Sequence, residues 1–344
     1  MLKPNDRLAI LLHGGLQSGS GKTGLSLLRY GDRPVVAVID QDCPGGSVPK
    51  LTGIDRQVPV VASVTEALAL EPTVLAIGIA PSGGALPEPW LQEVRQAVVA
   101  GLSVVNGLHT PMEPMFAPLL QPGQWVWDVR REPEGLAIGG GRARHLDCRR
   151  VLTVGTDMGI GKMSTCLELH SASVKRGLRS KFVATGQTGL MLGHDGVALD
   201  AVRIDFAAGA VEGQVMRWGP ENDILYIEGQ GSLVHPGSTA TLPLMRGSQP
   251  THLVLVHRVG RTHINHFPEF ALPTLPEAVY LYEAVAAASP SFSGAKVAAI
   301  ALNTWGLDEA AAQAAIAQAS QETGLPCSDV VRFGGETLLE AILS

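Results

Sequence analysis

The sequence has few cysteines and few charged residues, and both shortages narrow the class of protein. Its four cysteines, Cys43, Cys148, Cys166 and Cys327, are widely spaced in 344 residues and form no Cys-x-x-Cys pair. They favour reduced thiols and give no zinc motif. Charged residues make up 17% of the chain, and the net charge of −6 gives no basic surface for nucleic acid. We therefore expect no nucleic-acid partner.

Long hydrophobic runs and blocks of lysine or arginine are also missing. The apolar run at residues 8–12 is too short for a signal peptide or a membrane span, so we expect a cytoplasmic protein with no membrane partner. Apolar residues nevertheless make up 45% of the chain, which is enough for a sizeable core. The length favours two domains, at roughly 150 residues per domain.

Short apolar runs typical of strands alternate with helical patterns along the chain. Such alternation predicts mainly parallel sheets covered by helices, with ligands at the carboxyl ends of the strands. In the first half, strands are predicted at residues 7–12, 35–39, 58–62, 74–79, 103–105 and 125–129, and helices at 22–30, 64–70 and 88–100. In the second half, strands are predicted at 151–154, 181–185, 224–228, 252–257 and 297–302, and helices at 162–176, 276–288, 307–323 and 336–343.

Residues 132–150 interrupt this alternation. They contain three consecutive glycines at 139–141 followed by four arginines, and a new apolar strand begins directly after them. We place a domain boundary here, which gives domains at residues 1–148 and 149–344. A long surface loop inside one domain is the alternative.

The most informative segment is RVLTVGTDMGIGKMST at residues 150–165, where a buried strand leads into a glycine-rich turn that opens a helix. Glycines let successive N–H groups point at phosphate oxygens, while the helix N-terminus and a lysine add positive charge. The segment predicts a phosphate-binding P-loop. Its predicted phosphate-binding residues are Gly155, Thr156, Gly159, Gly161, Lys162, Met163 and Ser164.

This loop departs from the usual P-loop pattern in two ways. Five residues rather than four separate Gly155 from Gly161, and Met163 stands where Ser or Thr usually binds Mg²⁺. Ser164 or Thr165 is a substitute ligand, or acidic groups alone hold the ion. The alternative is a glycine turn that only joins a strand to a helix.

The loop resembles that of dethiobiotin synthetase and related amidoligases, which have the same five-residue spacing. The resemblance implies that Asp157 helps to place Mg²⁺. It also implies that Glu228, in Ile227-Glu228-Gly229, holds a metal ion or a substrate amine, and that Asn303 binds adenine. An exposed loop glutamate is the alternative for Glu228.

A resemblance over nearly the whole chain rests on residues 155–170, 182–189 and 227–236, continuing in 255–264. They are similar to a bacterial and archaeal family whose members have been assigned as D-glutamate N-acetyltransferases, and in which a methionine after the P-loop lysine is ordinary. The implied fold class is α/β. It consists of a Rossmann-like domain at 1–148 and a P-loop NTPase-like domain at 149–344, both with mainly parallel sheets.

The resemblance implies transfer of an acetyl group from acetyl-CoA to the amine of an acidic amino acid, D-glutamate. We expect Glu228, His257 and Asp157 to be catalytic. His257 is the expected base, because a histidine with a pKa near neutrality can take a proton from an attacking amine. Arg258 and Arg261 are expected to bind the substrate carboxylates.

Gln187, in the second of the resembling segments, is a further substrate-binding candidate. The histidines at 263 and 266 lie in a loop-like run without the helical spacing of a metal motif, so we expect no zinc.

The N-terminal half contains a second glycine-rich turn. Five residues separate Gly15 from Gly21-Lys22, and residues 19–24 match G-x-G-x-x-G with Asp40 at the end of the next predicted strand. The glycines come about six residues late for a dinucleotide fingerprint, so nicotinamide binding is not favoured. The turn at residues 81–84 is similar to that of CoA-binding Rossmann domains, which suggests a CoA phosphate site. A domain used only for packing is the alternative.

Three functions remain open. The favoured one is an N-acetyltransferase that uses acetyl-CoA. The alternatives are an ATP-dependent ligase with Mg²⁺, resembling dethiobiotin synthetase, and a non-catalytic nucleotide-binding regulatory protein. We expect a small-molecule substrate and a homo-oligomer.

Overall fold

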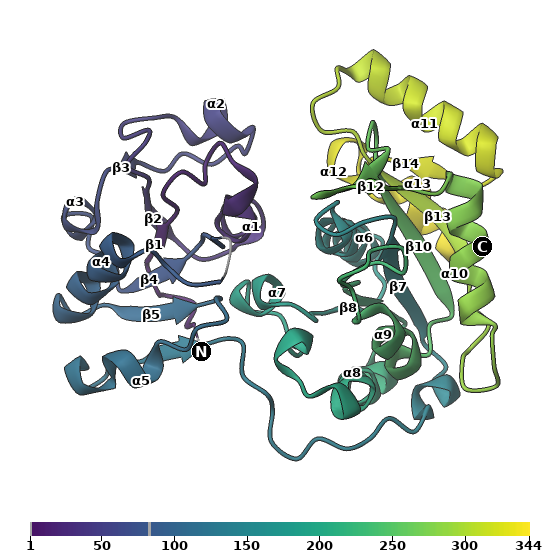
Figure 1. Ribbon diagram of the computed structural model, residues 1–344, viewed down its shortest axis with the longest axis horizontal. Coiled ribbons are helices and arrows are strands. Elements are labelled where there is room, and N and C mark those ends of the chain that lie inside the picture. Colours follow the sequence, from purple (N-terminus) through teal and green to yellow (C-terminus); the bar gives the residue numbers. More distant parts are fainter. Residues whose placement is uncertain (1, 82–83) are drawn as a thin grey trace. The chain divides into compact units, whose positions relative to one another are not determined.

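The computed structural model describes residues 2–81 and 84–344, which form two compact units (Figure 1). The first unit is the chain up to Arg131 together with Gln187–His194, and the second is Glu132–Gly186 with Asp195–Ser344. The domain boundary expected at residue 148 stays a prediction. Of the turn at residues 81–84, Ser82 and Gly83 lie outside the described residues.

The described part of the first unit contains a parallel sheet in the order β3-β2-β1-β4-β5-β6. This is the strand order of dinucleotide-binding Rossmann folds. Its strands are β1 (Leu8–Leu11), β2 (Val35–Ile39), β3 (Val60–Val61), β4 (Val74–Ile77), β5 (Ser103–Asn106) and β6 (Val126–Asp128). Its helices are α1 (Lys22–Tyr30), α2 (Val48–Thr52), α3 (Val64–Leu68), α4 (Glu88–Val99), α5 (Glu113–Phe116) and α7 (Gln187–Met191).

The described part of the second unit contains a parallel sheet in the order β14-β13-β10-β7-β9-β8. Its strands are β7 (Arg149–Gly155), β8 (Ser180–Val183), β9 (Ile224–Ile227), β10 (His252–Arg258), β13 (Lys296–Asn303) and β14 (Cys327–Ser328). Its helices are α6 (Lys162–Lys175), α8 (Ile204–Trp218), α9 (Thr241–Ser248), α10 (Leu275–Ala286), α11 (Glu309–Thr323), α12 (Val330–Phe333) and α13 (Glu336–Leu343). The predicted α/β class with two parallel sheets is therefore confirmed.

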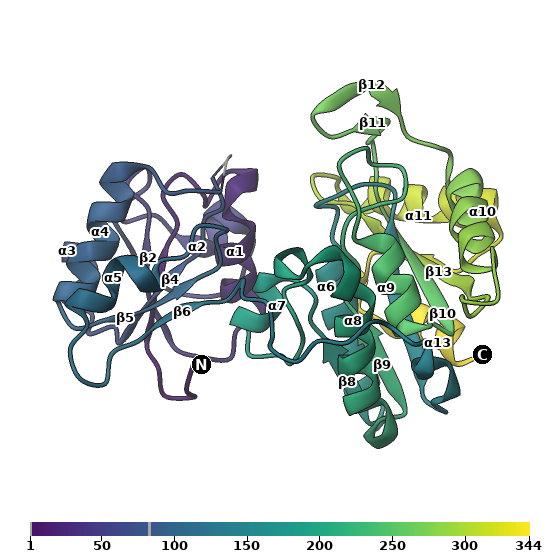
Figure 2. The same cartoon turned by 60° about the horizontal axis from the view of Figure 1, so that its bottom comes forward.

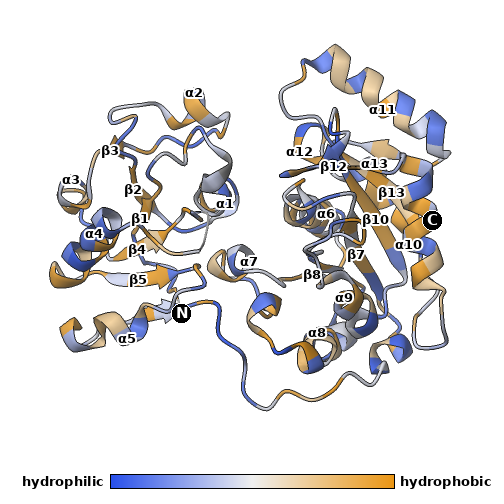
Figure 3. Cartoon of the chain, viewed as in Figure 1, coloured by the Kyte–Doolittle hydropathy of each residue, from blue (hydrophilic) through white to orange (hydrophobic). Residues whose placement is uncertain are grey.

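Local sequence accounts for most of these elements. The central strands are runs of aliphatic residues that are buried on both faces. Figure 3 shows their hydropathy. Helix α10 begins with a capping box between Thr274 and Glu277. Helix α11 begins at the side-chain cap of Asp308 and ends at Gly324, whose φ of 69° is in the left-handed region.

The helices of the second unit cover its sheet on both faces. Helix α6 packs with α12 and α13 on one face, and α10 packs with α11 on the other (Figure 1). The chain therefore leaves β7 toward one face and β10 toward the opposite face. A crevice for ligands is expected where the connections of neighbouring strands diverge in this way, so β7 and β10 bracket the expected site.

Two features of the second unit differ from the expectations. The loop-like run around His263 and His266 is an antiparallel hairpin of β11 (His263–Ile264) and β12 (Phe267–Ala271), which Figure 2 shows beyond the end of β10. Helices α8, α9 and α12 form in segments where no helix was expected. None of the helices in residues 2–81 and 84–344 has the length and hydrophobicity needed to cross a bilayer.

Helix α8 holds the glycine-rich segment at residues 139–141. The buried Glu212 carboxylate of α8 accepts hydrogen bonds from the N–H groups of Gly140 and Arg142 and from the Arg142 guanidinium. A Cβ on Gly209 of α8 would lie 1.7 Å from the carbonyl oxygen of Ala137. The segment before β7 is thus packed on the second unit.

Candidate phosphate site and the residues around it

The predicted P-loop connects β7 to α6. Residues 156–161 form the turn, in which Gly159 has a φ of 64° and Gly161 a φ of 117°, values that favour glycine. Gly155 leaves room for its neighbours, because a Cβ there would lie 2.8 Å from Cδ1 of Ile160 and 3.2 Å from the carbonyl oxygen of Val256. The glycines therefore set the backbone curvature that aims N–H groups at an anion.

Lys162 lies inside this loop. Its side chain is buried, and Nζ donates a hydrogen bond to the backbone carbonyl of Asp157 at 2.8 Å. The next residues, Met163 and Ser164, are half-buried in the first turn of α6. The lysine thus lies across the loop, where it can meet a phosphate.

Asp157 is fully buried and makes several contacts. Its carboxylate accepts hydrogen bonds from the N–H groups of Met158 at 2.6 Å and Asn265 at 2.9 Å. It also forms an ion pair with Arg261, with 2.7 Å between Nη1 and Oδ2. Asp157 and Arg261 were expected to act on metal and substrate. The structure instead pairs them with each other, and their roles in metal and substrate binding stay predictions.

His257 lies at the end of β10, beside the first residue of the turn. Its Nδ1 is 2.9 Å from Oγ1 of Thr156. Burial, and to a lesser degree the charge of Arg261, lowers the pKa of His257 below the usual 6.5. The imidazole is therefore neutral at neutral pH, the state that a general base requires.

Glu228 follows β9 and is buried, so the exposed-loop alternative is wrong. Its Oε2 accepts hydrogen bonds from the N–H groups of Thr185 at 2.9 Å and Gly186 at 3.1 Å. Burial raises the pKa of Glu228, while these hydrogen bonds and the charge of Lys162 oppose the rise. The residue after Glu228 has to be glycine, because a Cβ at Gly229 would lie 1.7 Å from the carbonyl oxygen of Thr153.

Arg258 and Asn303 lie in register on neighbouring strands. Both point away from the face of His257, since side chains alternate along a strand. Asn303 Nδ2 donates to the carbonyl of Ile160 in the P-loop at 2.9 Å, and adenine binding by Asn303 stays a prediction. Among the described residues, the half-buried Arg258 side chain has no hydrogen-bond or ion-pair partner. Arg258 is therefore a cation available to a ligand beside the P-loop.

Sequence reasoning missed Tyr282, a fully buried residue of α10. Its hydroxyl donates to the carbonyl of Gly155 at 2.6 Å and accepts from the N–H of Leu233 at 3.1 Å. Tyr282 thus holds the first residue of the P-loop from the opposite face of the sheet. A buried tyrosine needs a hydrogen-bond partner, but the sequence does not say which one.

No cluster of three or more His, Cys, Asp or Glu side chains suited to a metal ion occurs in the described parts of the chain. A Mg²⁺ ion on Asp157 would have to compete with Arg261 for the carboxylate. These residues fit the ion poorly, and Mg²⁺ binding by Asp157, Ser164 and Glu228 stays a prediction.

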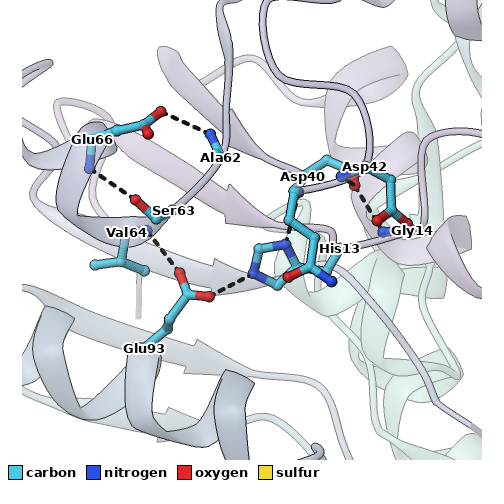
Figure 4. Close-up of polar contacts among 10 residues, drawn as sticks. His13, Gly14, Asp40, Asp42, Ala62, Ser63, Val64, Glu66 and Glu93 are labelled. Atoms are coloured by element: carbon cyan, nitrogen blue, oxygen red, sulfur yellow. Dashed lines mark hydrogen bonds and ion pairs between the residues drawn. The ribbon is translucent and has the colours of Figure 1, made fainter.

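The glycine-rich turn of the first unit is held by its own acid (Figure 4). Asp40 is buried and accepts a hydrogen bond from the N–H of Gly14 at 2.8 Å. It also accepts one from the N–H of Leu16 at 3.3 Å. The acid of the G-x-G-x-x-G pattern therefore binds the turn itself, which leaves it poorly placed for a ribose hydroxyl.

Both ring nitrogens of His13, which lies beside Asp40, have hydrogen-bond partners inside the protein. Its Nδ1 accepts the N–H of Gln41 at 3.0 Å, so Nε2 carries the proton and donates to Glu93 at 2.8 Å (Figure 4). Gln187 begins α7 in this unit, with Nε2 3.5 Å from Oγ1 of Thr23. The other predicted site residues belong to the second unit.

Fold and loop together define a protein with a Rossmann-like domain followed by a P-loop domain. The chain belongs to the DUF1611 family: the family's P-loop domain of unknown function matches residues 137–339, and its Rossmann-like domain of unknown function matches residues 41–132.

Three relatives illustrate this membership. A protein from Tritonibacter scottomollicae named D-glutamate N-acetyltransferase is 36% identical over 287 residues, covering 81% of this chain and 84% of that protein. A Pseudoalteromonas protein of the same name is 34% identical over 281 residues, with coverages of 80% and 83%. The crystal structure of a DUF1611 family protein from Anabaena variabilis ATCC 29413 is 62% identical and has a TM-score of 0.96, with coverages of 98% and 99%.

Proposed function

We propose that the protein is an N-acyltransferase that transfers the acetyl group of acetyl-CoA to the amine of D-glutamate. The observation that carries this proposal is the identity of 36% and 34%, over about four fifths of the chain, to two proteins named for that activity. The site geometry supports it, because the phosphate-type loop, the neutral His257 and Arg258, which has no ion-pair partner among the described residues, all lie at the carboxyl edge of the sheet, with His257 and Arg258 on opposite faces.

The proposed chemistry assigns one task to each group. The P-loop binds phosphates of the acyl donor, with Lys162 as counter-charge. The amine nitrogen attacks the thioester carbonyl, a C–N bond forms, and the C–S bond breaks. His257 accepts the proton that the amine loses and passes it to the departing CoA sulfur, which leaves as the free thiol. Glu228, with its raised pKa, is the second acid–base group.

Arg258 is the proposed partner of a substrate carboxylate. Arg261 is a weaker choice, because its charge is already balanced by Asp157. An unpaired guanidinium binds a carboxylate through two parallel hydrogen bonds. The proposal therefore assigns different tasks to two arginines that the sequence alone treats alike.

Thiol release from acetyl-CoA tests the proposal. The unmodified protein should release thiol when D-glutamate is added and much less with L-glutamate, and mass spectrometry should detect N-acetylglutamate. Phosphate release from ATP with Mg²⁺ and an amino acid, without thiol release, would favour a ligase. Tight binding of ATP with neither reaction would favour a regulatory protein.

A further inference from the structure

A cavity of about 390 Å³ lies in the second unit, next to His257. Its apolar lining comes from the base of the β11–β12 hairpin, the start of α10, the end of β13 and one side of α11. The main apolar contributors are Val259, Leu272, Leu275, Leu302, Ala315 and Ala319. The volume is at the lower end of the range of roughly 300–1,000 Å³ typical of ligand pockets, so it suits one part of a larger ligand.

The polar side chains that line this cavity already have partners inside the protein. Arg261 pairs with Asp157, and Gln318 donates to Glu322 at 2.7 Å. The three remaining ones are also bonded, because His257 contacts Thr156, Thr262 contacts His263, and Thr274 belongs to the capping box of α10. A carboxylate or phosphate would find no unbalanced cation here, so the lining favours a neutral and mostly apolar occupant.

One residue borders both the cavity and the phosphate site. His257 lines the cavity and contacts Thr156, the first residue of the P-loop turn. A ligand with phosphates on the P-loop and a neutral arm can therefore reach the cavity past His257. Acetyl-CoA has this composition, because its pantetheine arm carries amides and methyl groups but no charge.

We infer that the cavity receives the pantetheine arm of the acyl-CoA whose phosphates lie on the P-loop, an inference that rests on the proposed function. The thioester, at the far end of the arm, then lies in the cavity that the proposed base His257 lines.

Ala315→Phe tests this inference by filling the cavity from α11. Ala314→Phe is the matched control, since Ala314 is exposed on the same helix and does not line the cavity. Calorimetry should show an increase of about tenfold or more in the Kd of acetyl-CoA for Ala315→Phe, with no change for Ala314→Phe. Inorganic pyrophosphate, which has no arm, should bind all three proteins equally and so report an intact P-loop. If the phenyl ring of Ala315→Phe disturbs folding, Ala315→Leu serves in its place and should give a smaller increase in the Kd of acetyl-CoA.

Three results would overturn the inference. Equal acetyl-CoA affinity in Ala315→Phe and Ala314→Phe places the arm elsewhere and leaves the proposed function standing. An equal loss of ATP affinity in Ala315→Phe indicates that a purine base enters the cavity instead. Failure of the unmodified protein to bind acetyl-CoA removes both the proposed function and this inference.

Discussion

The two glycine-rich loops of this chain share a spacing and differ in what their acids do. In each, five residues separate a glycine from a Gly-Lys pair that opens a helix. In the first loop, Asp40 accepts the loop N–H groups and Lys22 is exposed. In the second, Asp157 accepts, among the described loop N–H groups, that of Met158 only and pairs with Arg261, and Lys162 is buried across the loop. The spacing identifies a glycine loop, whereas the position of the acid decides whether its amides are open to an anion.

Of the substitutions that compare the two loops, removal of Arg261 should have the largest effect, and it should act on the stability of the second unit. Arg261→Ala leaves the buried Asp157 carboxylate without its counter-ion, and we expect the free energy of unfolding of the second unit to fall by about 3 kcal/mol. Chemical denaturation measures the loss. Arg258→Ala is the matched control, because Arg258 has no ion-pair partner among the described residues, and its loss should change stability by less than about 0.5 kcal/mol. Equal stability of the two variants would show that the pair does not hold the loop.

Substitution of the two loop lysines compares the loops directly. Lys162→Ala should weaken binding of acetyl-CoA or ATP by about one to two decades, since a hydrogen bond to a charged group contributes roughly 1.5–3 kcal/mol. Lys22→Ala should leave the affinity within about twofold. Calorimetry on both variants decides between the loops, and a larger loss with Lys22→Ala would transfer the phosphate site to the first unit.

Enzyme kinetics can test the different roles proposed for Arg258 and Arg261. Arg258→Ala should raise the KM for D-glutamate by about tenfold, the effect of losing roughly 1.4 kcal/mol of binding, with a smaller change in kcat. Arg258→Lys keeps the charge but loses the planar fork, so it should recover only part of the affinity. An unchanged KM in Arg258→Ala would move carboxylate binding away from this residue.

The pH dependence of kcat/KM tests His257. Since the pKa of His257 is lowered from 6.5 in the folded protein, the neutral base should persist at pH 6.5 and activity should fall only at lower pH. The unfolded chain binds the proton more readily than the folded one, so acidification below about 6.5 also lowers the free energy of unfolding. His257→Asn should lose this acidic limb. A limb that survives in His257→Asn would assign the base to another group, such as Glu228.

Sequence reasoning predicted those features that depend on residues adjacent along the chain. Both parallel sheets and the P-loop were predicted, because strand, glycine turn, lysine and helix follow one another directly. Helix α8 was missed because Gly209 and Gly213 weaken its helical pattern, and its contacts with the segment before β7 stabilise it instead.

The site contacts between distant residues were beyond sequence reasoning. Arg261 and Asp157 are far apart along the chain, and so are Tyr282 and Gly155. No spacing rule links such residues, because the pairing depends on how the strands are ordered in the sheet. Arg258 and Arg261 were therefore indistinguishable until the partner of each was known.

The contact between Glu212 and residues 140–142 has a practical consequence for cutting the chain. A second unit shortened to begin at residue 149 would lose the N–H groups of Gly140 and Arg142 and the Arg142 guanidinium. Burial raises the pKa of the Glu212 carboxylate, and the hydrogen bonds of these groups outweigh burial and lower it. A fragment that begins at residue 132 retains them. The longer fragment should therefore resist proteolysis, and the shorter one should be digested first around α8.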